Sequence, residues 1–338
     1  MIFTDLLNGK TLKKPPVWIM RQAGRYLPEY RDVRKSADNF IDFCLTPEKA
    51  CEVTLQPIRR YDFDASIIFS DILLVPHAMG REVRFIPGTG PVLEKLSDIS
   101  QLKAPAHKDF LNYLKPVSQA VELTRSKLPE KTALIGFSGA PWTLMTYMLE
   151  GGGSRDFNYS RQWLWSEPAQ SEKLLQILCE YIVSFLSLQA KAGANVLMLF
   201  DSWAGAVPAA RRKTVIIDMH NQIISDLRAQ NIHLPIISFP KGLSEGLIEY
   251  CEQVDIQALG LDHYTDRHWA ARSLRRDIAL QGNLDPLALV AGGDQMKAEI
   301  DDILECFSNR RHIFNLGHGI VPQTPPEHVS ELLALLRQ

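Results

Sequence analysis

Residues 171–202, SEKLLQILCEYIVSFLSLQAKAGANVLMLFDS, place a helix-like pattern directly before a strand-like one. Apolar residues at 174, 175, 178, 182, 185 and 186 follow the spacing of one helix face, and Gly193 ends that pattern. The run NVLMLFDS (195–202) is then apolar almost without a break, which is typical of a parallel strand buried on both faces. This stretch therefore predicts an α/β chain in which helices and strands alternate.

The same alternation continues in both directions. Further strand-like runs are VWIM (17–20), ASIIFSD (65–71), ALIGFSG (133–139), LPIISFP (234–240), QALGLD (257–262), DIALQGNLD (277–285) and RHIFNLGHG (311–319). Helix-like segments lie at 47–61, where Thr46 is the expected N-cap, and at 213–231, 246–253 and 326–337. Eight strands alternating with helices predict one (β/α)8 TIM-barrel domain over residues 1–338, with its active site at the carboxyl ends of the strands. The alternative is an open doubly wound sheet, although no Gly-x-Gly-x-x-Gly opens a helix after a strand.

Charge and composition exclude several classes of protein. The 37 basic residues nearly balance the 39 acidic ones, for a net charge of -2, which argues against a nucleic-acid binder or an anionic-membrane binder. No apolar run approaches the roughly 18 residues of a membrane span. The five cysteines contain no Cys-x-x-Cys pair, which argues against a disulfide framework or a compact zinc module. Asp5 interrupts the N-terminal apolar residues, so we expect no secretory signal and a cytoplasmic protein.

Arginines gather in the loop that follows the first predicted strand. The segment RQAGRYLPEYRDVR (21–34) holds Arg21, Arg25, Arg31 and Arg34. Guanidinium groups hold carboxylates through paired hydrogen bonds, so this loop predicts a site for a polyanionic organic ligand. Gly24 would let the backbone approach such a ligand. For Arg31 and Arg34 the alternative is an ordinary solvated face with ion pairs.

Polar residues also stand at the other strand ends. These are Asp71, Asp201, Ser202, Lys241, Asp262, Asn283, Asp285 and His318, with Tyr147 downstream of the third predicted strand. Asp71 is either the N-cap of the following segment or a carboxylate at the floor of the pocket. His318, between two glycines, could titrate near neutrality or donate to an anion. Ser202 lacks the Gly-x-Ser-x-Gly elbow of a serine hydrolase, and Tyr147 is by default a core aromatic with a polar tip.

Six segments closely resemble the signatures of the uroporphyrinogen decarboxylase family. They are PPVWIMRQAGRYLPEYR (15–31), IIFSDILLVPHAMG (67–80), GFSGAPWTLMTYMLEGGGS (136–154), LFDSWAG (199–205), LQGNLDP (280–286) and NLGHGI (315–320). The resemblance implies a single (β/α)8 domain, usually a homodimer, that needs neither a metal nor an organic cofactor. Members of the family remove CO2 from the four acetate side chains of uroporphyrinogen III and so form coproporphyrinogen III in haem and related tetrapyrrole synthesis.

The resemblance also implies roles for individual residues. Asp71 and Arg21 would be catalytic, with Asp71 accepting hydrogen bonds from pyrrole N–H groups and stabilising positive charge on a protonated pyrrole. The substrate-binding set would be Arg21, Gln22, Ala23, Gly24, Arg25, Arg34, Asp71, Tyr147, Ser202 and His318. The proton donor stays open between an arginine and a water molecule.

Two other functions compete with this one. A zinc-dependent methyltransferase of the related cobalamin- or thiol-using barrels would need cysteine and histidine ligands near the late strands, but Cys251 and Cys306 lie on helix-like stretches. His263 and His268 are better interpreted as part of a polar loop than as a metal site. The second alternative is a non-catalytic tetrapyrrole-binding protein, which would bind the same ligand without turnover.

Overall fold

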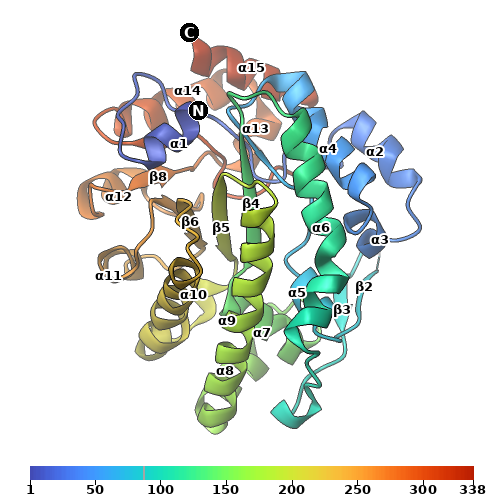
Figure 1. Ribbon diagram of the computed structural model, residues 1–338. Helices are drawn as coiled ribbons and strands as arrows, with labels where there is room; N and C mark the ends of the chain where they lie inside the picture. The colour runs from blue at the N-terminus through green and yellow to red at the C-terminus, as the bar shows by residue number, and fades with distance from the viewer. Residues whose placement is uncertain (87) are drawn as a thin grey trace.

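A curled parallel sheet of seven strands forms the centre of the computed structural model, which describes residues 1–86 and 88–338 (Figure 1). Its strands are β1 (Ala65–Ile67), β4 (Ala133–Gly139), β5 (Val196–Asp201), β6 (Ile236–Pro240), β7 (Ala258–Gly260), β8 (Ala279–Gln281) and β9 (His312–Ile313). They pair in chain order, and every pairing is parallel. All their carboxyl ends therefore lie on one face, at the bottom of Figure 1.

The strands form where the sequence is most continuously apolar. Strand β4 has the predicted bounds, and each of its residues is buried. It pairs with β5 in a register that sets Phe137 opposite Met198, and β5 pairs with β6 so that Leu199 lies opposite Ser238. In the other runs the regular strand is shorter than the predicted segment; β6 begins two residues later than predicted and ends at the predicted residue, whereas the remaining strands end before their predicted ends.

The predicted strand at residues 17–20 is wrong. Val17 forms only an isolated parallel bridge with Phe314, although its carbonyl also accepts a hydrogen bond from the Asp64 amide at 3.0 Å. Pro15 and Pro16 have no N–H group with which to extend a ladder, and the backbone turns at Arg21, where φ is 63°. The structure thus confirms an α/β fold with a parallel sheet, but with seven regular strands instead of eight.

Helices surround this sheet, and α6 and α9 lie in front of it in Figure 1. The α-helices are α1 (Ile2–Leu7), α2 (Pro28–Lys35), α3 (Phe40–Cys44), α4 (Pro47–Tyr61), α5 (Leu74–Ala78), α6 (His107–Lys127), α7 (Pro141–Glu150), α8 (Asn158–Ser166), α9 (Pro168–Lys191), α10 (Asp218–Ala229), α11 (Gly246–Gln253), α12 (Arg267–Ser273), α13 (Pro286–Ala291), α14 (Gly293–Cys306) and α15 (Pro326–Arg337). Short 3-10 helices lie at Ile99–Gln101, Ala204–Ala206 and Ala209–Arg211, and a π-helical turn at Lys213–Ile217 leads into α10.

The predicted helices are confirmed, with small differences at their ends. Helices α4, α11 and α15 have the predicted bounds, and α9 begins three residues before the predicted start. Pro47 occupies the first turn of α4, where its missing N–H costs nothing, but the Thr46 hydroxyl donates to the Asp42 carbonyl (2.7 Å) instead of capping the helix. The prediction that Thr46 occupies the N-cap position is therefore confirmed, although its side chain does not cap the helix.

Helix α9 is the one described helix that is long and apolar enough to cross a membrane by length and composition. In the structure, 61% of its most apolar window is buried inside the protein. Leu174, Leu178 and Ile182 have no exposed surface and belong to the hydrophobic core between the helices and the sheet. This burial is what a core helix of a globular protein shows.

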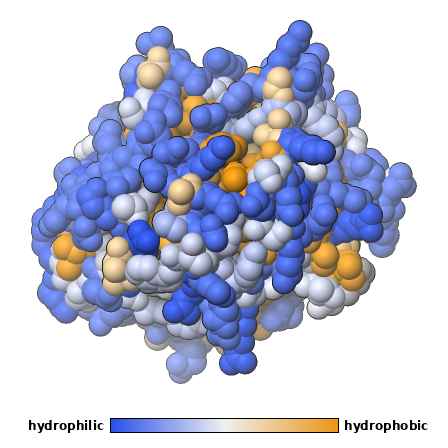
Figure 2. All heavy atoms as spheres, turned by 90° about the horizontal axis from the view of Figure 1, so that it is seen from below, coloured by the Kyte–Doolittle hydropathy of each residue, from blue (hydrophilic) through white to orange (hydrophobic). Residues whose placement is uncertain are grey.

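Additional elements outside the parallel sheet lie at the face formed by the carboxyl ends of its strands. A hairpin of β2 (Val83–Ile86) and β3 (Gly90–Leu93) lies there with α7 and α8 (Figure 1). Its edge continues onto the glycines after α7, because Val92 forms a bridge with Gly152, and a Cβ on Gly152 would lie only 2.9 Å from the Pro91 carbonyl oxygen. Figure 2 views the molecule from this side and shows hydrophobic atoms near the middle of a mostly hydrophilic face.

Candidate active site

The loop after the Val17 bridge holds Arg21 in an uncommon backbone conformation. Its φ of 63° lies in the left-handed region, which non-glycine residues rarely adopt and which clusters at functional sites. The residues on both sides of Arg21 hold this conformation. On one side, the Met20 amide donates to Asn315 Oδ1 (3.0 Å), and the Met20 carbonyl accepts from the Ile320 amide (2.9 Å). Gln22 is fully buried, and its Oε1 accepts from the Ile19 amide (3.2 Å). The loop thus presents Arg21 while it uses Gln22 to hold its own shape.

Asp71 lies four residues beyond the end of β1, at the carboxyl-end face. Its Oδ1 accepts a hydrogen bond from the Leu73 amide at 2.8 Å and so closes the turn before α5. The N-cap of α5 is Leu73, so the interpretation of Asp71 as an N-cap is wrong. Burial raises the pKa of the Asp71 carboxyl from 3.8 to about 6, although that hydrogen bond and the Arg21 charge both lower it. Closing this turn is compatible with a functional role, because the turn uses only one carboxylate oxygen.

Arg21 lies within electrostatic reach of three other predicted site residues. Its charge lowers the pKa of Asp71 and of Tyr147, while burial, the larger effect, raises both. Burial first, and Arg21 second, lower the pKa of His318 to about 4, so this imidazole is neutral at pH 7. The Arg21 side chain also packs over Gly319, where an added Cβ would lie 2.4 Å from Arg21 Cδ. The structure therefore brings Arg21, Asp71, Tyr147 and His318 together.

Ser202 follows β5 directly and lines a cavity of about 520 Å³ that opens beside this cluster. Trp203 connects the two, because its ring centroid lies 6.3 Å from that of Tyr147. The Trp203 amide donates to Thr143 Oγ1 (3.2 Å), and the Trp203 carbonyl accepts from Trp142 Nε1 (2.9 Å). Our sequence reasoning missed Trp203, although its place directly after Ser202 at a strand end was the available signal.

The remaining arginines of the 21–34 segment differ in their surroundings. Arg25 is exposed, beside Ala23 and Gly24, which are half-buried. Arg31 Nη1 donates to the carbonyls of Arg25 (2.8 Å) and Tyr26, so Arg31 supports the loop.

Arg34, on α2, donates to the Ala37 carbonyl at 3.0 Å and lies 5.6 Å from the Phe43 ring centroid. Burial raises the pKa of the Cys44 thiol. The Asp71 charge raises this pKa further, and the Arg34 charge lowers it. The charges of Arg34 and Asp71 therefore act on the same buried thiol.

Several polar strand-end residues are engaged inside the protein. Asp201 is fully buried; its Oδ1 accepts from Thr143 Oγ1 (2.6 Å), and its Oδ2 lies 3.4 Å from His220 Nε2. Asp262 accepts from the Gly242 amide (2.7 Å) and so joins the loops after β6 and β7. Asn283 donates to the Asp262 carbonyl, and Asp285 caps α13. These four residues support the loops that carry the cluster.

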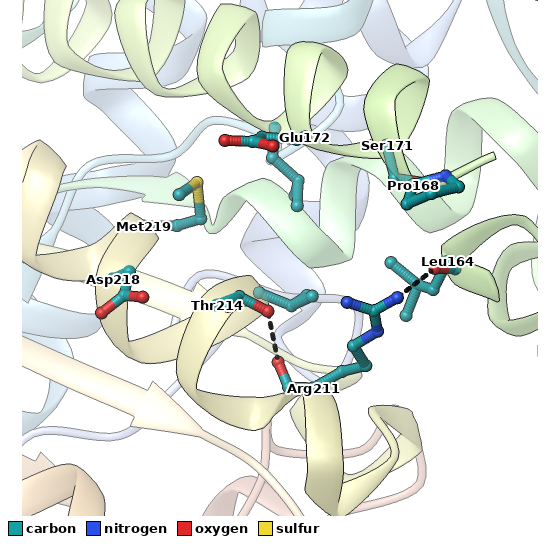
Figure 3. A pocket seen from close by; sticks show the side chains of 10 residues that line it. Leu164, Pro168, Ser171, Glu172, Arg211, Thr214, Asp218 and Met219 are labelled. Carbon is teal, nitrogen blue, oxygen red and sulfur yellow. Dashed lines mark hydrogen bonds between the residues drawn. The ribbon is translucent and has the colours of Figure 1, made fainter.

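A smaller cavity of about 200 Å³ lies in the outer helical layer between α9 and α10 (Figure 3). Arg211 points across it and donates to the Leu164 carbonyl at 3.0 Å. None of the predicted site residues lines this cavity. In the described part of the chain, no three His, Cys, Asp or Glu side chains gather closely enough to hold a metal ion.

Comparisons with solved structures describe the fold. The chain is similar to a methyltransferase from Methanosarcina mazei, with a TM-score of 0.82, 18% identity and coverage of 99% of this chain and 96% of that one. A putative vitamin-B12-independent methionine synthase from Listeria monocytogenes gives a TM-score of 0.55 at 12% identity, over 97% of this chain and 96% of that one. At such low identities the likeness concerns the fold alone.

Comparisons of sequence are far more specific. The family model described as uroporphyrinogen decarboxylase (URO-D) matches residues 2–338. A uroporphyrinogen decarboxylase from Rhodospirillum rubrum is 45% identical over 335 residues, which cover 99% of this chain and 96% of that protein. A second, from Maricaulis maris, is 44% identical over 333 residues, covering 98% and 96%. The matches span the whole site as well as the sheet, and the chain belongs to the uroporphyrinogen decarboxylase family.

Proposed function

We propose that the chain removes CO2 from the four acetate side chains of uroporphyrinogen III, forming coproporphyrinogen III, at the cluster of Arg21, Asp71, Tyr147 and His318. Family membership makes the chain an enzyme that decarboxylates uroporphyrinogen in tetrapyrrole biosynthesis. The observation that carries the site is one half-buried carboxylate, Asp71, with a raised pKa, which feels the charge of Arg21, an arginine with a positive φ at the carboxyl-end face. Neither competing function is favoured, because sequence similarity at 45% identity outweighs a shared fold at 18%.

Asp71 supplies the electrostatic part of the mechanism. When the bond between the acetate methylene and CO2 breaks, its electrons need a sink, and a pyrrole ring protonated on carbon provides one. A second proton then converts the methylene into a methyl group, and the ring releases the proton that it took up first. Each decarboxylation therefore consumes one proton overall. With a pKa near 6, Asp71 is an anion at neutral pH, accepts hydrogen bonds from pyrrole N–H groups and stabilises the cationic ring in a poorly solvated cleft.

The arginines hold and orient the carboxylates of the substrate. The charge of Arg21 lowers the pKa of Asp71, so Arg21 would bind the carboxylate that reacts, while Arg25 and Arg34 would bind other carboxylates of the substrate. We propose that neutral His318 acts as a hydrogen-bonding group and not as the proton donor, because its pKa of about 4 leaves it unprotonated at pH 7. The donor is then an arginine or a water molecule.

The other substrate contacts are neutral. Tyr147 and Ser202 would each offer a hydroxyl, the first in the cluster and the second at the edge of the 520 Å³ cavity. Gln22, Ala23 and Gly24 would contribute through the loop they form; Gly24 has no room for a side chain, because an added Cβ would lie 2.9 Å from the Arg21 carbonyl oxygen. This loop would shape the cleft while its arginines carry the charge.

We further propose that the sheet closes into a (β/α)8 barrel within one domain, residues 1–338. The support is the Val17 segment, which hydrogen-bonds toward both edge strands: the Trp18 amide donates to the Phe314 carbonyl, and the Asp64 amide to the Val17 carbonyl. In addition, we propose a cytoplasmic homodimer that works without a metal or an organic cofactor. Protonation of the pyrrole supplies the electron sink, so the chemistry requires none.

Incubation with uroporphyrinogen III in the dark under reducing conditions tests the function. We expect products with seven, six, five and finally four carboxyl groups, separated by chromatography, and turnover that survives exhaustive chelation. Binding with no product would support the tetrapyrrole-binding alternative and overturn the decarboxylase. Turnover that is lost on chelation and restored by zinc would overturn the cofactor-free mechanism.

A further inference from the structure

The cavity beside Ser202 has a distinctive composition. Its walls come from the α7–α8 segment and from the loops after β5, β6 and β7. Arg155, Arg161 and Lys241 line it, with Asp156 as the single acidic group among the lining residues. Trp203 and Phe157, whose ring centroids are 4.9 Å apart, form an aromatic surface in the same cavity. A space of about 520 Å³ with three cations and an aromatic wall fits an anionic, partly apolar organic group.

The three cations are available to a ligand. Within residues 1–86 and 88–338, none of their side chains forms an ion pair or a hydrogen bond, whereas the nearby Arg212 is paired with Glu245 at 2.9 Å. An arginine or lysine lining a concave wall without a partner keeps its full capacity to bind a carboxylate.

Lys241 connects this cavity with the catalytic cluster. Its ammonium nitrogen lies 5.6 Å from the Trp203 ring centroid, and its charge is also felt at His318. The backbone at this position is fixed, because the Lys241 amide donates to the Asp201 carbonyl (3.1 Å) and the Lys241 carbonyl accepts from the Gly205 amide (2.9 Å). Lys241 therefore stands between the two regions on a rigid support.

The substrate supplies the chemical reason for a second group of cations. Uroporphyrinogen carries eight carboxylates, and while one acetate reacts beside Asp71 the other seven need charge compensation elsewhere. Arg21, Arg25 and Arg34 do not line the cavity beside Ser202, whereas Arg155, Arg161 and Lys241 do. Resting on the function proposed above, we propose that Lys241, Arg155 and Arg161 form a distal subsite that binds carboxylates of the rings not undergoing reaction.

Direct binding of two porphyrins tests this subsite without relying on turnover. The probes are uroporphyrin, an oxidised octacarboxylate, and mesoporphyrin, a dicarboxylate, each titrated by fluorescence. Lys241→Met keeps an aliphatic side chain over Trp203 but removes the charge, so we expect it to bind uroporphyrin about three- to tenfold more weakly than the unmodified chain does. We expect a loss of about the same size for a double variant that carries Arg155→Gln and Arg161→Gln. Mesoporphyrin binding should change less than twofold, and Lys241→Arg should restore uroporphyrin binding.

A matched control is Lys191→Met, which removes an exposed lysine from the end of α9 on the opposite face and should change neither affinity. Uroporphyrin binding within twofold of the unmodified chain in both sets of cavity variants would overturn the subsite, as would equal losses for the two porphyrins. Failure of the proposed function looks different: the unmodified chain would then bind uroporphyrin through these cations but release no CO2 from uroporphyrinogen.

Discussion

Replacing Asp71 with asparagine should stabilise the protein while it abolishes turnover. Asp71 is half-buried, and its carboxyl forms one hydrogen bond, to the Leu73 amide, which an asparagine oxygen can also accept. Burial raises its pKa from 3.8 to about 6, so the folded chain holds this proton to higher pH than the unfolded chain does. The stability that the protonated form contributes is therefore complete below pH 3.8 and is lost as the pH rises toward 6.

The size of the effect follows from the shift. A difference of about two pKa units at roughly 1.4 kcal/mol per unit makes the ionised carboxylate cost about 3 kcal/mol of folding free energy above pH 7. With the linkage relation, the cost is about 1.6 kcal/mol at pH 5 and close to zero at pH 3. Asp71→Asn should therefore gain about 3 kcal/mol at pH 7.5 and about half of that at pH 5, measured by urea denaturation at both pH values.

A second buried carboxylate provides the control. Burial also raises the pKa of Asp64, which lies before β1 on the opposite face and accepts a hydrogen bond from the Val17 amide at 2.8 Å. Asp64→Asn should shift stability with pH in the same direction yet leave turnover in place. A stability difference for Asp71→Asn that does not vary with pH would refute the reasoning about its charge, and retention of near-normal turnover would remove Asp71 from the mechanism.

Two further outcomes follow from the same geometry. Because the proposed mechanism uses the Asp71 anion, kcat/KM should rise as the pH increases through about 6. The pKa of His318 is about 4, so this residue should cause no further change in kcat/KM between pH 6 and 8, and a flat profile across pH 5 to 7 would contradict the proposal. Gly319→Ala would place a methyl group against the Arg21 side chain, so it should lower kcat/KM about 10- to 100-fold with little change in Tm. In Gly317→Ala the added methyl group would lie 2.2 Å from the backbone nitrogen of His263, so this variant should lower Tm clearly. The reverse ranking in kinetics and thermal melts would show that Arg21 is not held as described.

Local sequence was sufficient for the elements with strong and uninterrupted patterns. Strand β4 is apolar throughout, and α4 and α15 begin at prolines that suit the first helical turn, so their bounds could be predicted. The run at 17–20 is also apolar and buried but lies between two prolines and the turn at Arg21, and these decide its conformation. The β2–β3 hairpin went unpredicted, although Gly88 and Gly90, both with positive φ, are the turn residues that signal it.

The strand-end rule identified the right face but not the direction of each side chain. Asp71 and Asp201 both follow apolar strands, yet only Asp71 lies in the cluster. Asp201 is instead bound by Thr143 and His220, which come from α7 and α10. Such partners are 58 and 19 residues away along the chain and become neighbours only when the helices pack. No local pattern can therefore separate a supporting carboxylate from a catalytic one.

The energetic cost of ionised Asp71 supports the proposed catalytic role of this residue over a merely supporting one. Asp201 receives a hydroxyl and faces a histidine, as buried carboxylates normally require, whereas Asp71 has a single amide and the charge of Arg21 nearby. About 3 kcal/mol is a large share of the 5–15 kcal/mol that holds a typical domain together. A charge that weakens the fold this much is explained if its missing partner is the cation that forms on the substrate during the reaction, and Asp71 then stabilises the transition state more than it stabilises the empty site.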